Sequence, residues 1–349
     1  MRHRDHRLVP SWAAALLPFC PGGFALLLRG SDVNVPANTL SLAGSNNTEV
    51  SAACFEALHM PVVNRTQDMP AVHNLLNLGG IARPVEERDS IELRRQVLCY
   101  LKTVVDPCQV PSITRPTESL KMALAGQGHT CAVVSSSGIM TVTSAGKRID
   151  EADVVMRFNN VTVKGFEKFV GSKETLRFVN MHFAAKVLKG NFTADPSVIY
   201  VCALPTGPNT QKRWEELAER RPDLQLFMVP RDMSKNVGAA LRLLYDAPEY
   251  FNGPSKLPTT GAVGMLLAMS LCSKVDAYGM AVSDHAVQLG SKVPYHYDKV
   301  GGAATENAWH ESFVPEKRLW RFLASEPNLL ETQELAQVDM QAASCEPQA

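Results

Sequence analysis

The chain has 349 residues, a formal net charge of zero and 20% charged residues. This length is enough for one large domain with a sizeable core and leaves little for a second domain of full size. The neutral balance argues against a nucleic-acid-binding protein, because such proteins carry a basic patch, whereas lysine and arginine form no long run here. We therefore expect one large domain that does not bind nucleic acid.

The N-terminus is typical of a targeting segment. Arg2, Arg4 and Arg7 precede an uncharged stretch from Leu8 to Leu28, and about 20 residues are needed to cross a bilayer. Basic residues before such a stretch predict a cytosolic N-terminus and a lumenal chain. We expect residues 1–28 to form a cytosolic tail and a signal-anchor that spans the membrane. Because prolines and glycines interrupt the stretch, a cleaved signal peptide is the alternative.

Cysteines and glycosylation sequons also indicate a lumenal chain. Eight cysteines fit an oxidising compartment. Cys20 lies in the apolar N-terminal stretch and is expected to be unpaired, and the other seven are odd in number, so at least one of them is free or intermolecular. Cys202 lies in an apolar run and is predicted to be a buried free thiol. The candidate N-glycosylation sites are the asparagines of four sequons, Asn46, Asn64, Asn160 and Asn191.

The region before the main domain lacks a regular pattern. Residues 29–90 are rich in Asn, Ser, Pro and Thr without a sustained period, which predicts a stem linker. A helix is predicted from Val85 to about Val105, because its apolar positions recur with a period near 3.6. We expect the main domain to cover residues 91–330, and the polar stretch 331–349 to be a frayed C-terminal tail.

Strands and helices alternate from Gly128 onward. Buried strands are predicted at Thr130–Val134, Val154–Phe158, Leu176–Asn180, Val198–Ala203, Leu226–Val229 and Val275–Met280. Helices are predicted at Gln211–Arg221, Met233–Tyr245 and Gly261–Cys272. This alternation implies an α/β fold with a largely parallel sheet that helices cover on both faces.

Two of the predicted strands end in small polar residues. The first stops at Ser135-Ser136-Ser137-Gly138, and the second ends in Asn159-Asn160. In open α/β sheets, strands that end in this way present backbone N–H groups to a phosphate or a sugar. The sequence therefore predicts a site for a nucleotide-like ligand at the carboxyl edge of the sheet.

Three further segments carry candidate site residues. Thr259-Thr260-Gly261 opens an apolar helix and is either an anion site or an ordinary N-cap. Tyr295-His296-Tyr297-Asp298 either donates hydrogen bonds to a leaving phosphate or forms a strand with alternating burial. His310 is followed by Glu316, and a lone histidine of this kind is more often structural than catalytic.

Together these segments resemble the four sialyl motifs of the animal-type sialyltransferases, glycosyltransferase family 29. The long motif of that family reads Cys-Ala-Val-Val-Gly-Asn-Ser-Gly, then Arg-Met-Asn, Gly-Phe-Glu and Val-Gly-Thr-Lys-Thr. The matching residues are Cys131–Val134, Ser137-Gly138, Ile149-Asp150, Arg157–Asn159, Gly165–Glu167 and Val170–Lys173. The short motif, Pro-Ser-Thr-Gly, Leu-x-Leu-Cys and Val-Asp-x-Tyr-Gly, is matched by Pro258–Gly261, Leu271-Cys272 and Val275–Gly279.

The third motif is an aromatic and histidine-rich tetrapeptide, similar to Tyr295–Asp298. The last is a histidine followed by a glutamate after four residues. Two departures stand out. Ser135-Ser136 occupies the place of the family's Gly-Asn, and five residues rather than four separate His310 from Glu316.

The resemblance implies a fold and a set of site residues. The fold would be a single Rossmann-like nucleotide-sugar transferase domain, a variant of the GT-A fold. The donor-binding residues would be Ser136, Ser137, Asn159, Thr259, Thr260, Gly261 and Tyr295. The catalytic residues would be His310, His296 and Glu316. By the same resemblance a disulfide joins Cys131 to Cys272, and Cys345 pairs with Cys99 or Cys108.

The implied activity is transfer of sialic acid from CMP-sialic acid to a glycan hydroxyl on a glycoprotein or glycolipid. The transfer inverts the anomeric configuration, with His310 as the general base, because an imidazole of near-neutral pKa can accept the proton of an attacking hydroxyl. We expect no cofactor and no metal, since neither a His-Glu-x-x-His nor a paired Cys-x-x-Cys pattern occurs. The family also implies a single-pass type II protein of the Golgi membrane with a lumenal catalytic domain.

Two alternatives are open at this stage. The first is a transferase for another CMP-activated acidic sugar, such as a Kdo-like sugar. The second is a catalytically silent lumenal glycan-binding relative on the same scaffold. The acceptor and the linkage depend on loops such as Leu204–Lys212 and Asp284–Val293, where the resemblance is weakest.

Overall fold

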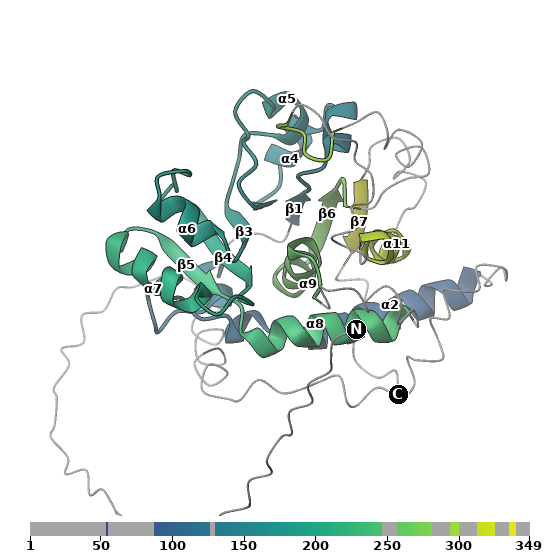
Figure 1. Cartoon of the computed structure of the whole chain (residues 1–349). Coiled ribbons are helices and arrows are strands. Elements are labelled where there is room, and N and C mark those ends of the chain that lie inside the picture. The colour runs from purple at the N-terminus through teal and green to yellow at the C-terminus, as the bar shows by residue number, and fades with distance from the viewer. Residues whose placement is uncertain are drawn as a thin grey trace, which may run out of the picture. The chain divides into compact units, whose positions relative to one another are not determined.

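Seven strands of the described residues form a single sheet (Figure 1). The structure is a computed structural model that describes Cys54 and residues 87–125, 130–245, 257–280, 294–299, 313–324 and 335–339. The strands are β1 (Thr130–Val134), β2 (Val154–Phe158), β3 (Leu176–Asn180), β4 (Ile199–Leu204), β5 (Gln225–Met228), β6 (Lys274–Tyr278) and β7 (Leu335–Asp339). The longer helices are α2 (Glu87–Val104), α7 (Thr210–Arg220), α8 (Arg231–Tyr245), α9 (Thr260–Leu271) and α11 (Phe313–Leu323).

The order of the strands reverses once. They lie in the order β5-β4-β3-β2-β1-β6-β7, and β1 to β6 are parallel, whereas β7 is antiparallel to β6. The chain therefore adds β2 to β5 on one side of β1 and then returns to place β6 on its other side. In open α/β sheets, the ligand binds where the strand order reverses in this way, at the carboxyl ends of the strands.

Alternate residues of each strand face opposite layers, as the period of two requires. In β1, Cys131 and Val133 pack with α2, α8, α9 and α11, while Ala132 and Val134 pack with the short elements η3 (Gly138–Val142), α4 (Gly146–Asp150) and α5 (Glu167–Val170). Under β3 to β5, that second face is covered by α6 (Phe183–Leu188) and α7, around Trp214. Helices therefore cover both faces, and the predicted α/β fold with a mostly parallel sheet is confirmed.

The helix α9 lies against the middle of the sheet and is apolar on every side. All residues from Ala262 to Met269 are buried, as is typical of a helix enclosed by other elements. It packs against β1, β3, β4 and β6, and also against α2 and α8. Gly264 makes this close packing possible, because a Cβ there would lie 2.6 Å from a ring carbon of Phe158 and 2.7 Å from one of Phe178.

Most predicted elements are confirmed to within two residues. The differences concern the predicted boundaries at the two ends of the domain. The helix α2 begins at Glu87, so the expected boundary between stem and domain at residue 90 falls inside a helix. Cys54, in the expected stem, forms a disulfide with Cys108. The rest of the predicted stem, and the predicted anchor at residues 1–28, lie outside the described residues.

The prediction of a frayed tail at residues 331–349 is wrong for residues 335–339. These form β7, which pairs with β6 along its whole length. Val338 is fully buried, and Gln337 donates a hydrogen bond of 3.1 Å to the Asp276 carboxylate. The apolar residues of this edge strand are interrupted by Gln337 and preceded by the polar residues 331–334, so no continuous apolar run marks the strand in the sequence.

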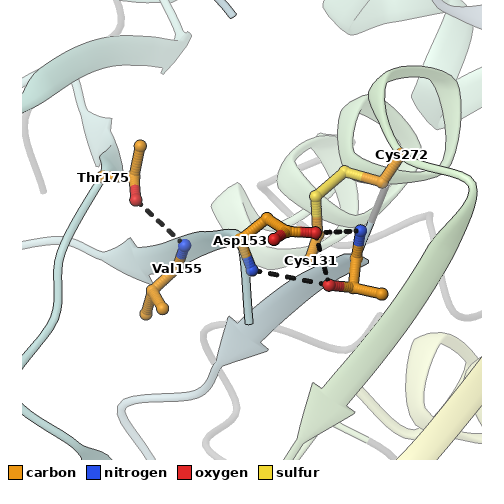
Figure 2. Close-up of a disulfide and its surroundings, with 6 residues drawn as sticks. Cys131, Asp153, Val155, Thr175 and Cys272 are labelled. Carbon is orange, nitrogen blue, oxygen red and sulfur yellow. Dashed lines mark hydrogen bonds between the residues drawn. A yellow bond between two sulfur atoms is a disulfide. The ribbon is translucent and has the colours of Figure 1, made fainter. Parts of the chain in front are cut away.

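The predicted disulfide between Cys131 and Cys272 is confirmed. Figure 2 shows that it joins β1 to the residue that follows α9. Beside it, the Asp153 carboxylate accepts hydrogen bonds from the backbone N–H and the hydroxyl of Thr130, which ties the start of β1 to the start of β2. The disulfide thus anchors the C-terminal end of α9 to the central strand.

The remaining described cysteines differ partly from expectation. Cys108 pairs with Cys54, so of the two partners expected for Cys345 only Cys99 is left, and Cys99 is itself disulfide-bonded. Cys345 lies outside the described residues. Cys202 is a buried free thiol, as predicted, and burial raises its pKa to about 12. Among the described helices, none combines the length and the apolarity that a membrane crossing requires.

Replacing Cys131 and Cys272 together by serine is expected to lower the free energy of unfolding by about 5 kcal/mol, because the bond closes a loop of 141 residues in the unfolded chain. Denaturant titration measures this loss. The control is Cys202→Ala, which removes a buried thiol that forms no disulfide and is expected to cost only about 1 kcal/mol. Equal losses in the two variants would contradict the stabilising role of the disulfide.

Candidate functional site

The candidate site lies where the carboxyl ends of β1 and β6 meet. The backbone N–H of Ser135, which follows β1, donates to the carbonyl oxygen of Tyr278 at 2.9 Å. Gly279, which follows β6, has a φ of 65°, a conformation that glycine adopts without strain. A Cβ at this glycine would also lie 2.7 Å from the Met140 sulfur. The two strand ends are therefore closely packed, and glycine is required at this point.

The serine turn after β1 is held by hydrogen bonds within the turn and by contacts to the segment that begins at Pro294. Ser135 Oγ accepts a hydrogen bond of 3.0 Å from the backbone N–H of Ser137. Ser137 Oγ caps η3 by accepting from the N–H of Ile139. Gly138 donates its N–H to the Pro294 carbonyl, and a Cβ there would lie 2.0 Å from that oxygen. The predicted turn is thus rigid, and Ser136 and Ser137 lie at the end of β1.

The segment Tyr295–Tyr297 runs antiparallel to this turn, so the structure brings the first and third motifs together. Tyr297 donates its N–H to the carbonyl oxygen of Ser136 at 3.1 Å. His296 and Ser137 form an isolated antiparallel β-bridge. His296 Nδ1 lies 3.3 Å from the same Ser136 oxygen. The rings of Tyr295 and His296 are half-buried neighbours, with centroids 4.4 Å apart.

The protonation state of His296 follows from its surroundings. Burial lowers the pKa of its imidazole, the nearby Lys299 charge lowers it further, and the Ser136 hydrogen bond opposes both. Because a carbonyl oxygen can only accept, Nδ1 must carry the proton in the bond to Ser136. The neutral ring then has an unprotonated Nε2, which can donate to an anion only after the ring takes up a second proton.

Asn159 directly follows β2 and has a left-handed conformation with a φ of 52°, which asparagine tolerates better than most residues. Its backbone N–H donates to the Phe178 carbonyl at 2.8 Å, and its side-chain oxygen accepts from the N–H of Asn180 at 3.1 Å. The amide nitrogen of Asn159 is consequently the part of the side chain suited to donate to a ligand.

The residues of the turn before α9 have two different roles. Thr259 is the N-cap of α9, since its Oγ1 accepts from the N–H of Ala262 at 3.0 Å. It is only 5% exposed. Of the two interpretations of this turn, the N-cap therefore applies to Thr259. Thr260 and Gly261 are half-buried at the first turn of the helix, where N–H groups have no partner within the helix and can bind an anion.

Glu316 comes from α11 and reaches the same turn. Its carboxylate accepts a hydrogen bond of 3.0 Å from the Thr259 N–H and another from the Thr259 hydroxyl. The side chain is buried, with 4% exposed. A carboxylate at this end of α9 also interacts favourably with the helix dipole. The Thr259 hydroxyl therefore both donates and accepts within the protein.

Some predicted site residues remain untested by the structure. His310, Asn46 and Asn64 lie outside the described residues. Asn160 and Asn191 are exposed, as a glycosylation site must be, and the Asn160 side-chain oxygen accepts from Lys186 Nζ at 2.8 Å.

Three charged residues that were not predicted as site residues support the connection between β2 and β3. Arg157 and Arg177 lie inside strands, are 3% and 4% exposed, and donate to loop carbonyl oxygens. Asp150 accepts from the N–H groups of Ser172 and Lys173. Burial would raise the pKa of Asp150, but these hydrogen bonds outweigh it and hold the pKa below the usual value. A charged residue within an apolar strand is the signal that could have identified the two arginines.

Comparisons with known proteins give a consistent result. The family described as glycosyltransferase family 29 (sialyltransferase) matches residues 101–327. A beta-galactoside alpha-2,6-sialyltransferase 2 of Danio rerio is 27% identical over 285 residues, which are 74% of this chain and 54% of that protein. Beta-galactoside alpha-2,6-sialyltransferase 1 of Homo sapiens is 29% identical over 224 residues, which are 60% of this chain and 52% of that protein. The chain thus spans about half the length of these curated relatives.

A solved structure described as a mammalian sialyltransferase is 20% identical, with a TM-score of 0.41, over 73% of this chain and 82% of that chain. A second, with Gal-beta-1-3GalNAc-ortho-nitrophenol, is 22% identical, with a TM-score of 0.42, over 72% of this chain and 80% of that chain. Since the family match covers well over half of the residues, the chain belongs to glycosyltransferase family 29, the sialyltransferases.

Proposed function

We propose that this protein transfers sialic acid from CMP-sialic acid to a hydroxyl of a glycan on a glycoprotein or glycolipid. The observation that supports this most is the position of the motifs. The serine turn and the Tyr295–Tyr297 segment are hydrogen-bonded to each other at the point where the strand order reverses. Asn159 directly follows the neighbouring strand β2. Such a position binds nucleotides in open α/β sheets.

The proposed reaction is a single displacement. His310 accepts the proton of the acceptor hydroxyl as its oxygen attacks the anomeric carbon of the sugar. The bond between that carbon and the phosphate oxygen breaks on the opposite face, so the configuration inverts and CMP leaves with the bonding electrons. Tyr295, His296 and the N–H groups at Thr260-Gly261 stabilise the departing phosphate. Asn159, Ser136 and Ser137 hold the nucleotide.

We assign Glu316 a supporting part in this reaction. Its carboxylate is buried and bound to Thr259. It therefore acts on the donor through the turn that opens α9, whose next two residues are Thr260 and Gly261.

The reaction is proposed to need neither a metal nor another cofactor. The donor is a monophosphate ester with a single negative charge on its phosphate. A protonated His296 and N–H dipoles held in fixed positions can neutralise this charge. The first acceptor to test is a terminal β-galactoside, because the curated relatives described above are named beta-galactoside alpha-2,6-sialyltransferases. The proposed location is the Golgi membrane, with residues 1–28 as a type II anchor and the catalytic domain in the lumen, glycosylated at the exposed Asn160 and Asn191.

A secreted form lacking residues 1–28 is expected to sialylate galactoside acceptors from CMP-sialic acid in the presence of EDTA. His310→Ala is expected to lower kcat by about 100-fold or more, because general-base catalysis contributes that much. Mass spectrometry of the products measures both. Activity with a Kdo-type donor and none with CMP-sialic acid would contradict the assignment of sialic acid as the transferred sugar. Binding of CMP-sialic acid without turnover on any acceptor would favour a glycan-binding relative.

Glu316→Gln is expected to lower the free energy of unfolding by ~1–3 kcal/mol, because the amide has one acceptor oxygen and leaves one buried donor of Thr259 unsatisfied. The KM for CMP-sialic acid is expected to rise in the same variant, since the turn before α9 is loosened. Thermal unfolding and initial rates measure the two effects. The matched control is Glu219→Gln on the exposed side of α7, and equal behaviour of the two variants would refute the role of Glu316.

The affinity for CMP-sialic acid is expected to fall as the pH rises through the neutral range. Burial holds the pKa of the free His296 below its ordinary value, whereas a bound phosphate raises it, so between these two pKa values binding takes up one proton. The dissociation constant is expected to increase by up to tenfold per pH unit in that window. Calorimetry in buffers of different ionisation enthalpy measures the proton uptake. His296→Gln is expected to abolish it, and an unchanged uptake would assign the proton to another group.

A further inference from the structure

Arg177 is a charged residue in the middle of a buried strand. It lies in β3, its side chain is 5% exposed, and its neighbours Leu176 and Phe178 are fully buried. Burying a charge is costly unless the charge is paired and hydrogen-bonded. A full set of partners is therefore needed to keep this guanidinium in place.

These partners come from two segments. Arg177 Nη1 donates to the carbonyl oxygens of Asn159 at 2.7 Å and of Val161 at 3.0 Å. On its other edge, Nε and Nη2 donate to the two carboxylate oxygens of Glu174. The guanidinium carbon also lies 5.8 Å from the centroid of the Phe192 ring. The guanidinium thus joins the carboxylate of Glu174 to the loop that follows β2.

The loop that Arg177 holds is the turn of Asn159. A left-handed residue needs support from its surroundings, and here two carbonyl oxygens, at Asn159 and Val161, are fixed by one guanidinium nitrogen. The side-chain oxygen of Asn159 is fixed in addition by the N–H of Asn180. Backbone and side chain together set the direction in which the Asn159 amide nitrogen can donate.

Glu174 is a particular feature of this chain. It stands directly after Val170-Gly171-Ser172-Lys173, where the family pattern given above ends in threonine. Its side chain is 16% exposed, and both of its carboxylate oxygens accept hydrogen bonds from the Arg177 guanidinium. Such a two-point pairing fixes the plane of the guanidinium, which the point charge of a lysine could not provide.

We propose that Arg177, oriented by Glu174, is a positioning residue for donor binding: it holds the Asn159 turn so that the amide nitrogen meets the nucleotide. This inference rests on the proposed function, because it takes CMP-sialic acid as the ligand. Arg177 itself touches no substrate and acts through Asn159 alone. Its removal is therefore expected to change the affinity for the donor and not the affinity for the acceptor.

The test is a double-mutant cycle of Arg177→Lys and Asn159→Ala in the full chain, with kcat and both KM values as readouts. Each single variant is expected to raise the KM for CMP-sialic acid about tenfold, the effect of losing one hydrogen bond to a charged group. The KM for the acceptor is expected to stay within about twofold. The double variant is expected to have the same donor KM as Asn159→Ala, because residues that act through one another are not additive. Glu174→Gln is expected to give a smaller effect in the same direction.

A matched control separates positioning from loss of stability. Leu217→Ala removes a buried side chain of α7 that packs under the other part of the sheet, and it is expected to lower the melting temperature while leaving the donor KM unchanged. Additive effects in the cycle, or a donor KM of Arg177→Lys equal to that of the wild type, would overturn the inference.

Failure of the proposed function gives a different result. In that case the wild-type chain neither binds CMP-sialic acid nor transfers from it. Amide hydrogen exchange then decides whether Arg177 holds the turn: Arg177→Lys is expected to speed exchange at Asn180, whose N–H is bonded to the Asn159 side chain. Unchanged exchange at this amide would overturn the inference without any reference to the donor.

Discussion

The helix α9 must be held in one position between the sheet and the outer helices, because it contacts four strands and carries a turn of the proposed donor site at its start. This helix has no polar face, so burial between the sheet and the outer helices stabilises it, and burial alone does not fix its position along its own axis. Both of its ends are tied instead. Glu316 binds the N-cap residue Thr259, and the disulfide of Cys272 joins the other end to β1. These ties place the first turn of α9 at a defined height against the strands.

A common arrangement recurs around the proposed donor site. Residues suited to meet the ligand lie on turns, and a buried charged side chain holds two of these turns through backbone groups. Glu316 does so for the turn that contains Thr260, and Arg177 does so for the turn of Asn159. Groups held in this way need little rearrangement when a ligand binds, which preserves both affinity and geometry. The serine turn after β1 is held differently, by pairing with the Tyr295–Tyr297 segment.

Much of the fold could be predicted because its signals are local. The runs Val154–Phe158 and Leu176–Asn180 are short, apolar and bounded by turns, and they became β2 and β3 with the expected bounds. The edge strand β7 could not be recognised in this way, because polar residues interrupt its apolar ones. It is stabilised by pairing with β6. The pairing of Cys108 with Cys54 likewise depends on which loops meet in space.

The α/β class and the strands that end in polar residues could be read from the sequence, and the resemblance of its motifs added the disulfide between Cys131 and Cys272. The roles of the supporting charges became visible only in the folded chain. Glu316 is 57 residues from Thr259, and Arg177 is 18 residues from Asn159. Propensity and periodicity describe the neighbourhood of a residue along the chain. The partner of a buried charge is instead set by which distant segments must come together to enclose the core.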